Sequence, residues 1–161
     1  MDIYILRHGI AADAHEGQAD SERALTPEGR KKLRNVLGAA AGAGARPSLI
    51  LTSPYRRAVQ SAQLAAEVLD YKGDLLRTSA LEPGSTPASV WDEIRTHRDE
   101  PRILLSGHEP LFSSLTAFLL DCPSLHIDFK KGGLVCVEVD RMGSAAPNGV
   151  LKWYLVPKLV T

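Results

Sequence analysis

Short apolar runs alternate with longer helical patterns along most of the chain. Three of these runs, at residues 3–6, 49–51 and 103–105, are each followed by polar residues and then by a stretch of helical character. This rhythm is typical of parallel βα units, in which each strand leads into a helix that returns over the sheet. A further short strand is predicted at residues 75–78.

Most of the predicted helices begin with a hydroxyl residue followed by proline. A Ser or Thr side chain can cap the first free backbone N–H groups, and the fixed φ of proline suits the first helical position. These pairs are Thr26-Pro27, Ser53-Pro54 and Thr86-Pro87, and Pro110 suggests a fourth start. The predicted helices cover residues 27–41, 55–70, 87–98 and 110–120.

The C-terminal part of the chain follows a strand pattern instead. Residues 134–139 and 150–156 are β-rich runs, separated by turn material at residues 140–143 and 147–149. Two such runs joined by turn residues predict an antiparallel hairpin. We therefore expect one α/β domain over residues 1–161. Its architecture should be a three-layer αβα sandwich, with a mostly parallel central sheet and an antiparallel C-terminal hairpin or edge strand.

Length and charge limit the classes of partner. With 161 residues, 44% of them hydrophobic, the chain can bury one core and is short for two. Nineteen basic residues balance nineteen acidic ones, so no overall field would draw the protein to nucleic acid or to an acidic membrane. The basic clusters at residues 30–32 and at Lys130-Lys131 are interpreted as solvated positions, and no nucleic-acid partner is expected.

The N-terminus and the cysteines favour a cytoplasmic protein. Asp2 precedes the first apolar run and Arg7 follows it, which does not match the basic and long apolar regions of a signal peptide. No membrane association is expected. Cys122 and Cys136 are far apart in the sequence and are interpreted as reduced core thiols rather than as a disulfide framework. We expect a monomer.

The candidate chemistry gathers at three predicted strand ends. Arg7-His8-Gly9 follows the first strand, Arg57 lies in the helix start after the second, and His108 follows the strand at 103–105. In a parallel sheet, ligands bind in the crevice beyond the carboxyl ends of the strands. A neutral imidazole can attack phosphorus, and guanidinium groups can keep it deprotonated and hold phosphoryl oxygens. One pocket could therefore support phosphoryl transfer.

Each of these residues also has a structural interpretation. Taken alone, His8 could be a hydrogen-bonded core histidine, Arg57 a surface residue of the pair Arg56-Arg57, and His108 a helix-capping residue. Their equivalent positions in successive βα units favour a shared site. The polar loop at residues 10–25 is likewise either a lid or binding loop, or a solvated excursion.

A metal site is the competing use of the histidines. The five histidines are His8, His15, His97, His108 and His126. They show no H-E-x-x-H or similar pair. We expect metal-independent chemistry without an organic cofactor.

Three motifs resemble the histidine phosphatase superfamily, which includes the phosphoglycerate mutases. They are L-R-H-G at residues 6–9, T-S-P-Y-R-R-A-V-Q-S-A at 52–62, and S-G-H-E-P at 106–110. The resemblance implies a hydrolase in which His8 is phosphorylated, and Arg7, Arg57 and His108 complete the phosphate pocket. Arg57 is chosen over Arg56 because the family's Arg directly precedes the Ala of this motif. Gly9 would allow close approach of the backbone, and phosphate or its mimics would bind there.

The chain is most similar to the short bacterial phosphohistidine phosphatases. The minimal length, the tract at residues 20–29 and H-x-P-L at residues 108–111 carry this similarity. It implies a phosphatase acting on phosphohistidine in a partner protein. Arg23 would then swing over the phosphate, or simply be solvated.

The leaving-group acid is open. Phosphomonoesterases of the superfamily use an acidic residue for this step, and Glu82 after the third strand is the candidate, with Glu109 a weaker one. Two alternative functions follow. The substrate could be a small phosphomonoester with Glu82 as acid, or the chain could be a non-catalytic module that binds phosphate or a phosphopeptide. A mutase is disfavoured, because little of the chain could form a closed lid.

Overall fold

A six-stranded mixed sheet forms the centre of the molecule. The computed structural model describes residues 1–140 and 146–160, so residues 141–143 of the turn predicted at 140–143 lie outside them. The strand order is β3-β2-β4-β1-β5-β6. The strands are β1 Asp2–Arg7, β2 Leu49–Thr52, β3 Leu75–Arg77, β4 Arg102–Gly107, β5 Leu134–Glu138 and β6 Val150–Leu155. Strands β1 to β4 pair in parallel, and β5 is antiparallel to both β1 and β6. The predicted C-terminal hairpin is therefore confirmed.

In the described part of the chain, four α-helices cover the sheet close to the predicted positions. They are α1 Pro27–Gly42, α2 Arg56–Val68, α3 Pro87–Thr96 and α4 Leu111–Leu119. Thr26 and Thr86 cap α1 and α3 by accepting backbone N–H groups at 2.9 and 3.2 Å. The predicted cap at Ser53 is wrong, because α2 begins at Arg56 after the N-cap residue Tyr55, and the Ser53 hydroxyl has another partner described below.

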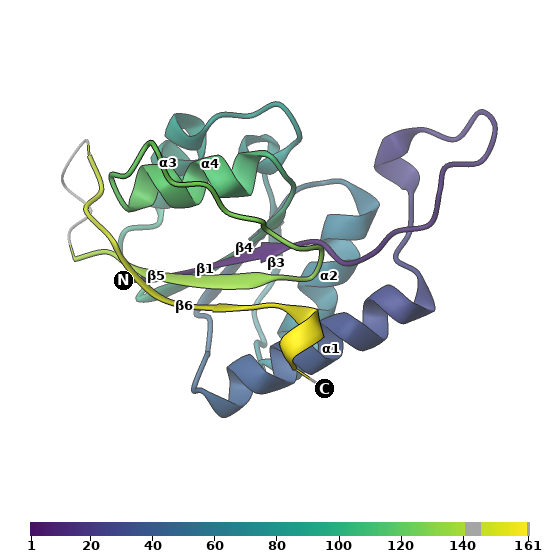
Figure 1. Cartoon of the computed structure of the whole chain (residues 1–161), viewed down its shortest axis with the longest axis horizontal. Helices are drawn as coiled ribbons and strands as arrows, with labels where there is room; N and C mark the ends of the chain where they lie inside the picture. The colour runs from purple at the N-terminus through teal and green to yellow at the C-terminus, as the bar shows by residue number, and fades with distance from the viewer. Residues whose placement is uncertain (141–145, 161) are drawn as a thin grey trace.

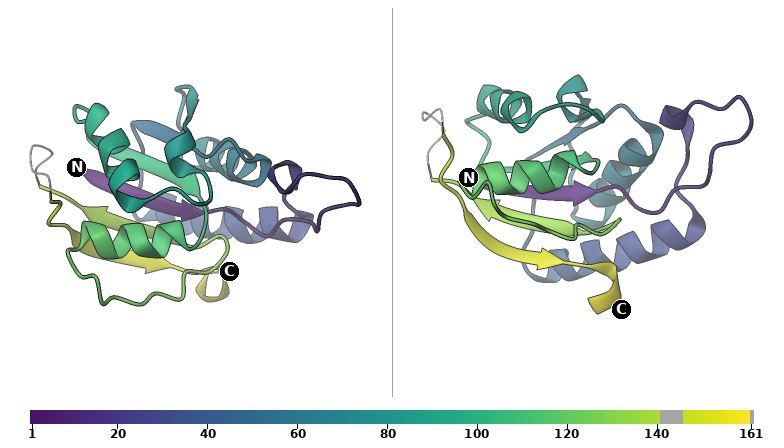
Figure 2. Two further views of the ribbon diagram at one scale, coloured as in Figure 1. Left: turned by 90° about the horizontal axis from the view of Figure 1, so that it is seen from above. Right: turned by 45° about the horizontal axis from the view of Figure 1, so that its top comes forward.

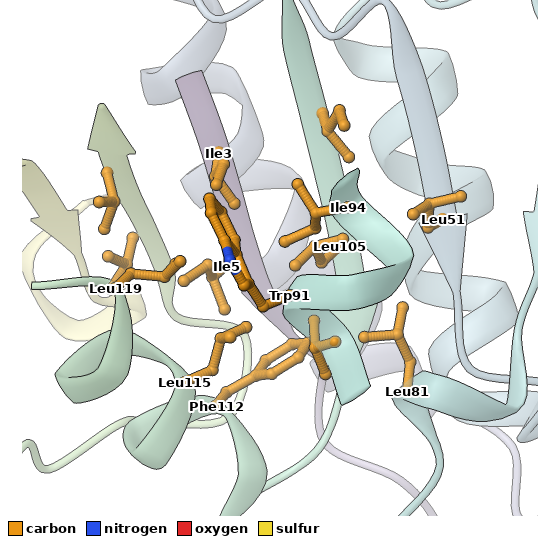
Figure 3. Packing of buried hydrophobic residues seen from close by; sticks show 14 of the residues in the cluster. Ile3, Ile5, Leu51, Leu81, Trp91, Ile94, Leu105, Phe112, Leu115 and Leu119 are labelled. Atoms are coloured by element: carbon orange, nitrogen blue, oxygen red, sulfur yellow. The ribbon is translucent and has the colours of Figure 1, made fainter. Parts of the chain in front are cut away.

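The helices form two layers, one on each face of the sheet (Figures 1 and 2). Side chains alternate along β1 as a strand requires. Ile3 and Ile5 enter the core that contains Trp91 of α3 and Phe112 of α4, and Figure 3 shows this packing. Tyr4 and Leu6 face the core beneath α1 and α2. The result is the predicted α/β sandwich of three layers.

The register brings the functional strand ends to one edge. Arg7 is paired with Gly107, and Thr52 with Ser106, so β1, β2 and β4 end at the same level. Since β6 runs parallel to β1, it also ends there and leads into the 3₁₀ helix η3, Pro157–Leu159. The loop between β1 and α1, which contains the 3₁₀ helix η1 (Asp20–Glu22), projects from this edge (Figure 1).

Candidate active site

Two histidines lie side by side at this edge of the sheet. The backbone N–H of His8 donates to the carbonyl of Gly107 at 3.0 Å, which continues the β1–β4 pairing beyond the strands. The rings of His8 and His108 lie 5.2 Å apart between centroids. Both side chains are buried, with residue exposures of 7% and 2%. The prediction that the two strand ends meet is therefore correct.

The His8 ring is held with one nitrogen free to act as a nucleophile. Its Nδ1 lies 2.7 Å from the Gly9 carbonyl, which can only accept, so Nδ1 carries the hydrogen. The lone pair is then on Nε2, which accepts a hydrogen bond from Arg57 Nε at 3.3 Å. The pKa of His8 falls from 6.5 to about 3, chiefly because of burial, with His108, Arg57 and Arg7 adding to the effect. His8 is neutral at pH 7.

Gly9 brings the first turn of α1 against the end of β1. A Cβ at this position would lie 3.3 Å from both the Gly29 carbonyl oxygen and Leu25 Cδ2. The Gly9 N–H donates to Ser61 Oγ at 3.1 Å, and the Ser61 hydroxyl donates to the Arg57 carbonyl at 2.7 Å. Gly9 thus allows the close approach of α1, and its N–H is already used within the protein, whereas its predicted role in binding phosphate stays a prediction.

Arg57 reaches into the site from the first turn of α2. Its residue exposure is 6%, whereas Arg56 is exposed, in agreement with the choice made from the sequence. The two terminal nitrogens of Arg57 donate to the backbone carbonyl and the carboxylate of Asp20, at 2.9 and 3.1 Å. Together with the bond to His8, these contacts engage all three guanidinium nitrogens.

Asp20 is a site residue that the sequence analysis did not single out. Its carboxylate bridges Arg57 and Arg23, with Arg23 Nη1 at 3.0 Å. Hydrogen bonds from Arg23 and Arg57 lower the pKa of Asp20. Arg23 also donates from Nε to the Ala12 carbonyl at 2.8 Å. Arg23 is therefore linked to the pocket through Asp20, and within the described residues it makes no hydrogen bond with either histidine. The signal for Asp20 was its place at the start of the tract at residues 20–29.

His108 is oriented by Ser53. Its Nε2 lies 2.8 Å from Ser53 Oγ, which accepts the Tyr55 N–H at 3.2 Å. When the Ser53 hydroxyl donates to Nε2, the ring hydrogen of His108 is on Nδ1; in the other tautomer Nε2–H donates to Ser53 Oγ. Within the described residues Nδ1 is buried and has no partner. Burial, followed by the charge of Arg57, lowers the pKa of His108 to about 4.

Arg7 also has a buried N–H without a partner. One terminal nitrogen donates to the Phe129 carbonyl at 2.5 Å, whereas Nε is buried and unpaired within the described part of the chain. Burial lowers the pKa of Arg7, and the charge of Glu109 opposes this. An unpaired buried donor is costly, so the free Nε–H of Arg7 points to a bound acceptor such as an oxyanion, and Nδ1 of His108 is a second unpaired polar atom of the site.

The two candidate acids are placed differently. Glu109 precedes the N-cap residue of α4, and its carboxylate accepts the N–H and the hydroxyl of Ser113 in the first turn at 2.6 and 2.5 Å. Glu82 directly follows Leu81, whose carbonyl lies 3.4 Å from the position of a Cβ built on Gly107. Glu82 is therefore near the end of β4 and half-buried, and its carboxylate makes no hydrogen bond or ion pair with any described residue.

Neither cysteine is close to this chemistry. Cys136 is buried in β5, where burial raises its pKa to about 12, while Cys122 is half-buried rather than in the core. Among residues 1–140 and 146–160, no three or more His, Cys, Asp and Glu side chains are grouped where they could hold a metal ion. Over the same residues, no helix has both the length and the apolar character needed to cross a bilayer.

Comparison with known proteins agrees with these findings. The sequence model described as histidine phosphatase superfamily (branch 1) matches residues 3–81. A Picosynechococcus protein of uncharacterised function is 31% identical over 137 residues, which cover 84% of this chain and 83% of that protein. The phosphohistidine phosphatase SixA of Escherichia coli is 27% identical over 164 residues, which cover 98% and 94% of the two chains.

Solved structures show the same fold. The protein histidine phosphatase SixA complexed with tungstate is similar with a TM-score of 0.87 and 27% identity, covering 99% of both chains. The putative phosphohistidine phosphatase SixA from Agrobacterium tumefaciens has a TM-score of 0.80 at 23% identity, covering 97% of both chains.

Proposed function

This chain belongs to the histidine phosphatase superfamily and is a phosphatase, and from that premise we propose that it dephosphorylates phosphohistidine in a protein through a phosphorylated His8. The observation that carries the proposal is the Nε2 lone pair of His8. This atom belongs to a neutral ring whose other nitrogen is fixed on the Gly9 carbonyl, and it faces Arg57. Such a ring is a nucleophile in a single tautomer.

In the first step, Nε2 of His8 forms a bond to phosphorus. The P–N bond to the substrate imidazole breaks, and its electron pair returns to that nitrogen. The substrate reacts with its other ring nitrogen protonated, so the ring that leaves is a neutral imidazole. Arg57 and Arg7 stabilise the charge on the equatorial oxygens, and His108 adds a hydrogen bond from Nδ1 in the tautomer in which Nε2 accepts from Ser53.

In the second step, water releases the phosphoryl group. The water oxygen forms a bond to phosphorus while the bond to Nε2 of His8 breaks. The electron pair returns to Nε2, a proton is released, and inorganic phosphate leaves the pocket. His8 returns to its neutral starting tautomer, so the two proposed steps balance without a cofactor or an external oxidant.

The carboxylates around the site favour a leaving group that needs little acid catalysis. Asp20 is hydrogen-bonded to Arg57, but the hydrogen bonds from two arginines lower its pKa and keep it ionised. Glu109 is engaged by Ser113. An alkoxide leaving from an ester needs a proton from an acid, whereas a phosphorylated imidazole can take up a proton from solvent on its other ring nitrogen before it leaves. Phosphohistidine therefore suits this pocket better than an unactivated ester.

A small phosphomonoester is the second candidate substrate, because Glu82 lies near the end of β4 without a partner for its carboxylate. Glu82→Gln would abolish a proton donor while keeping the shape of the side chain. If esters are the substrates, their kcat should fall roughly 10²-fold or more. Retained activity on phosphohistidine, with Glu109→Gln as a matched control, would assign Glu82 no role in the proposed reaction.

The proposal is tested by comparing wild type with His8→Ala. Release of phosphate is measured from a histidine-phosphorylated phosphotransfer domain, from free phosphohistidine and from a panel of small phosphate esters. We expect His8→Ala to lower kcat/KM roughly 10³-fold or more on every substrate that wild type hydrolyses. His126→Ala, an exposed histidine outside the pocket, should retain full activity.

Trapping the intermediate gives an independent readout. Brief incubation with a ³²P-labelled phosphohistidine protein, followed by an alkaline denaturing quench, should leave label on wild type and none on His8→Ala. Unchanged turnover in His8→Ala would reject His8 as the nucleophile. Absence of turnover by wild type, with retained phosphate binding, would instead favour the non-catalytic binding module.

A further inference from the structure

We propose that a basic groove beside the phosphate pocket docks an acidic segment of the phosphorylated protein substrate. The groove is lined by Arg7, Lys32, Lys130, Lys131, Lys158 and Leu159, together with neighbouring residues, and has a volume of about 830 Å³. This inference rests on the proposed function, because it explains how a protein carrying phosphohistidine would be positioned.

The groove is joined to the active site by the loop that precedes β5. The N–H of Gly132 lies within hydrogen-bond distance of the carbonyls of both Arg7 and His8, at 3.1 and 3.0 Å, and the Arg7 N–H donates to the Gly133 carbonyl at 3.0 Å. Lys130 and Lys131 therefore belong to a loop fixed directly on the strand end that carries the nucleophile. A bound segment in the groove would lie next to the pocket.

The other wall is the C-terminal 3₁₀ helix. A Cβ built on Gly132 would lie 3.4 Å from Pro157 Cγ, so η3 packs on the same loop. The Tyr154 hydroxyl accepts the Lys130 N–H at 2.8 Å and donates to the Asp128 carbonyl at 2.9 Å. Lys158 of η3 therefore lines the same groove as Lys130 and Lys131, and η3 lies close to the C-terminal end of the ribbon (Figure 1).

The charge of the groove differs from that of the whole chain. The chain has no net charge, yet the described residues that line this groove include five cations and a single acidic residue, Asp128. Lys131 and Lys158 form no ion pair within the part of the chain that the structure describes. Lys130 pairs with Asp128 and Lys32 with Glu28, but these side chains are about half exposed or more, so the pairs can readily exchange partners. The complementary surface is acidic.

Apolar residues line the groove together with the charged ones. Leu159 is 79% exposed, the highest value among the exposed large hydrophobic residues described. Ile10, Val156 and Pro157 also line the groove. A groove of this volume has room for several side chains, whereas the phosphoryl group itself is held by Arg57 and its neighbours. An acidic protein segment with an apolar residue fits this combination better than the body of a small phosphate ester.

Charge reversal at the two unpaired lysines tests the docking. In Lys131→Glu/Lys158→Glu, kcat/KM for the histidine-phosphorylated phosphotransfer domain should fall about tenfold or more at low ionic strength, through KM. The loss should shrink as salt is added. Turnover of free phosphohistidine, which has the same P–N bond without a protein, should stay within about twofold. The matched control is Lys72→Glu/Arg98→Glu, which makes the same charge change at exposed positions away from the groove.

The outcomes separate this inference from the proposed function. A selective loss on the phosphoprotein supports docking. An equal loss on free phosphohistidine, an equal loss in the control, or full activity on the phosphoprotein would overturn it while leaving the His8 mechanism intact. A selective loss on a small acidic phosphate ester would assign the groove to a small substrate and also overturn it. If wild type fails on every phosphohistidine protein, both proposals are rejected. Thermal unfolding of each variant checks that the fold is retained.

Discussion

Arg57 donates its Nε–H to Nε2 of His8 at 3.3 Å, so the proposed nucleophilic atom and the proposed phosphate-binding side chain are in direct contact. The contact joins the first turn of α2 to the end of β1. A guanidinium in this position favours the neutral imidazole, and its terminal nitrogens extend to where phosphoryl oxygens would have to be bound. Orientation of His8 and recognition of the substrate are therefore expected to depend on one residue.

Replacing Arg57 should reduce activity even when the charge is kept. Arg57→Lys retains a cation but loses the planar fork that contacts His8 and Asp20 together. We expect kcat/KM to fall roughly 10²-fold, chiefly through kcat. Arg56→Lys is the matched control, because its side chain is the exposed neighbour on the same turn. Steady-state kinetics on free phosphohistidine make the comparison, and similar losses in both variants would argue against a specific role for Arg57.

Asp20 should compete with oxyanions for Arg57. Its carboxylate occupies a terminal nitrogen that a phosphoryl group would need. Asp20→Asn removes the charge, so tungstate should inhibit this variant about two to five times more strongly than wild type, in line with the strength of a partly exposed ion pair. Asp13→Asn, in the same exposed loop, should leave inhibition unchanged. Weaker inhibition of Asp20→Asn would show that Asp20 assists anion binding instead.

The two histidines should make the protein sensitive to acid. The pKa values of His8 and His108 are lowered to about 3 and about 4. Below pH 6.5, both imidazoles bind protons in the unfolded chain. In the folded chain they bind protons only when the pH falls to about 4 and about 3. The unfolded state therefore binds more protons, and the free energy of unfolding decreases as pH falls from about 6.5 towards 3. Above 6.5 this contribution is fully present.

Two measurements check this behaviour. NMR titration of ring signals, assigned by their loss in His8→Asn and His108→Asn, should show both rings still neutral at pH 5. Urea unfolding is then compared at pH 7 and pH 4.5 for wild type and for the double variant His8→Asn/His108→Asn. The free energy of unfolding should fall more between these two pH values in wild type. A ring that titrates near 6.5 would mean that burial does not exclude its charged form.

Local patterns in the sequence were sufficient for the elements and for the main site residues. Apolar runs and Thr-Pro caps depend on neighbours in sequence, and the common edge of parallel strands then places His8, His108 and Arg57 together. Ser53 was misassigned as a helix cap because its partner, His108, is 55 residues away. Asp20 was missed for the same reason, since its contact with Arg57 spans 37 residues. Such contacts are set by tertiary packing, which no local propensity encodes.

The loop after His8 is fixed by a close approach to helix α1, and this gives a test of stability. A Cβ on Gly29 would lie only 2.3 Å from the Ile10 carbonyl oxygen. That oxygen accepts the Thr26 N–H at 2.9 Å, so it cannot move without breaking a hydrogen bond at the start of α1. Backbone atoms must therefore shift in Gly29→Ala. We expect a loss of about 1–3 kcal/mol in the free energy of unfolding.

Gly38→Ala is the matched substitution in the same helix. Gly38 is exposed, and a Cβ there would have nothing within 4 Å. Alanine is preferred to glycine inside a helix, so this variant should gain about 0.5–1 kcal/mol. Urea unfolding at pH 7 measures both changes. Opposite signs would show that Gly29 is required by the contact with Ile10 rather than by helix propensity. Equal effects would mean that the loop after His8 can relax away from α1, and the positioning of Gly9 against Gly29 would then contribute little to the site.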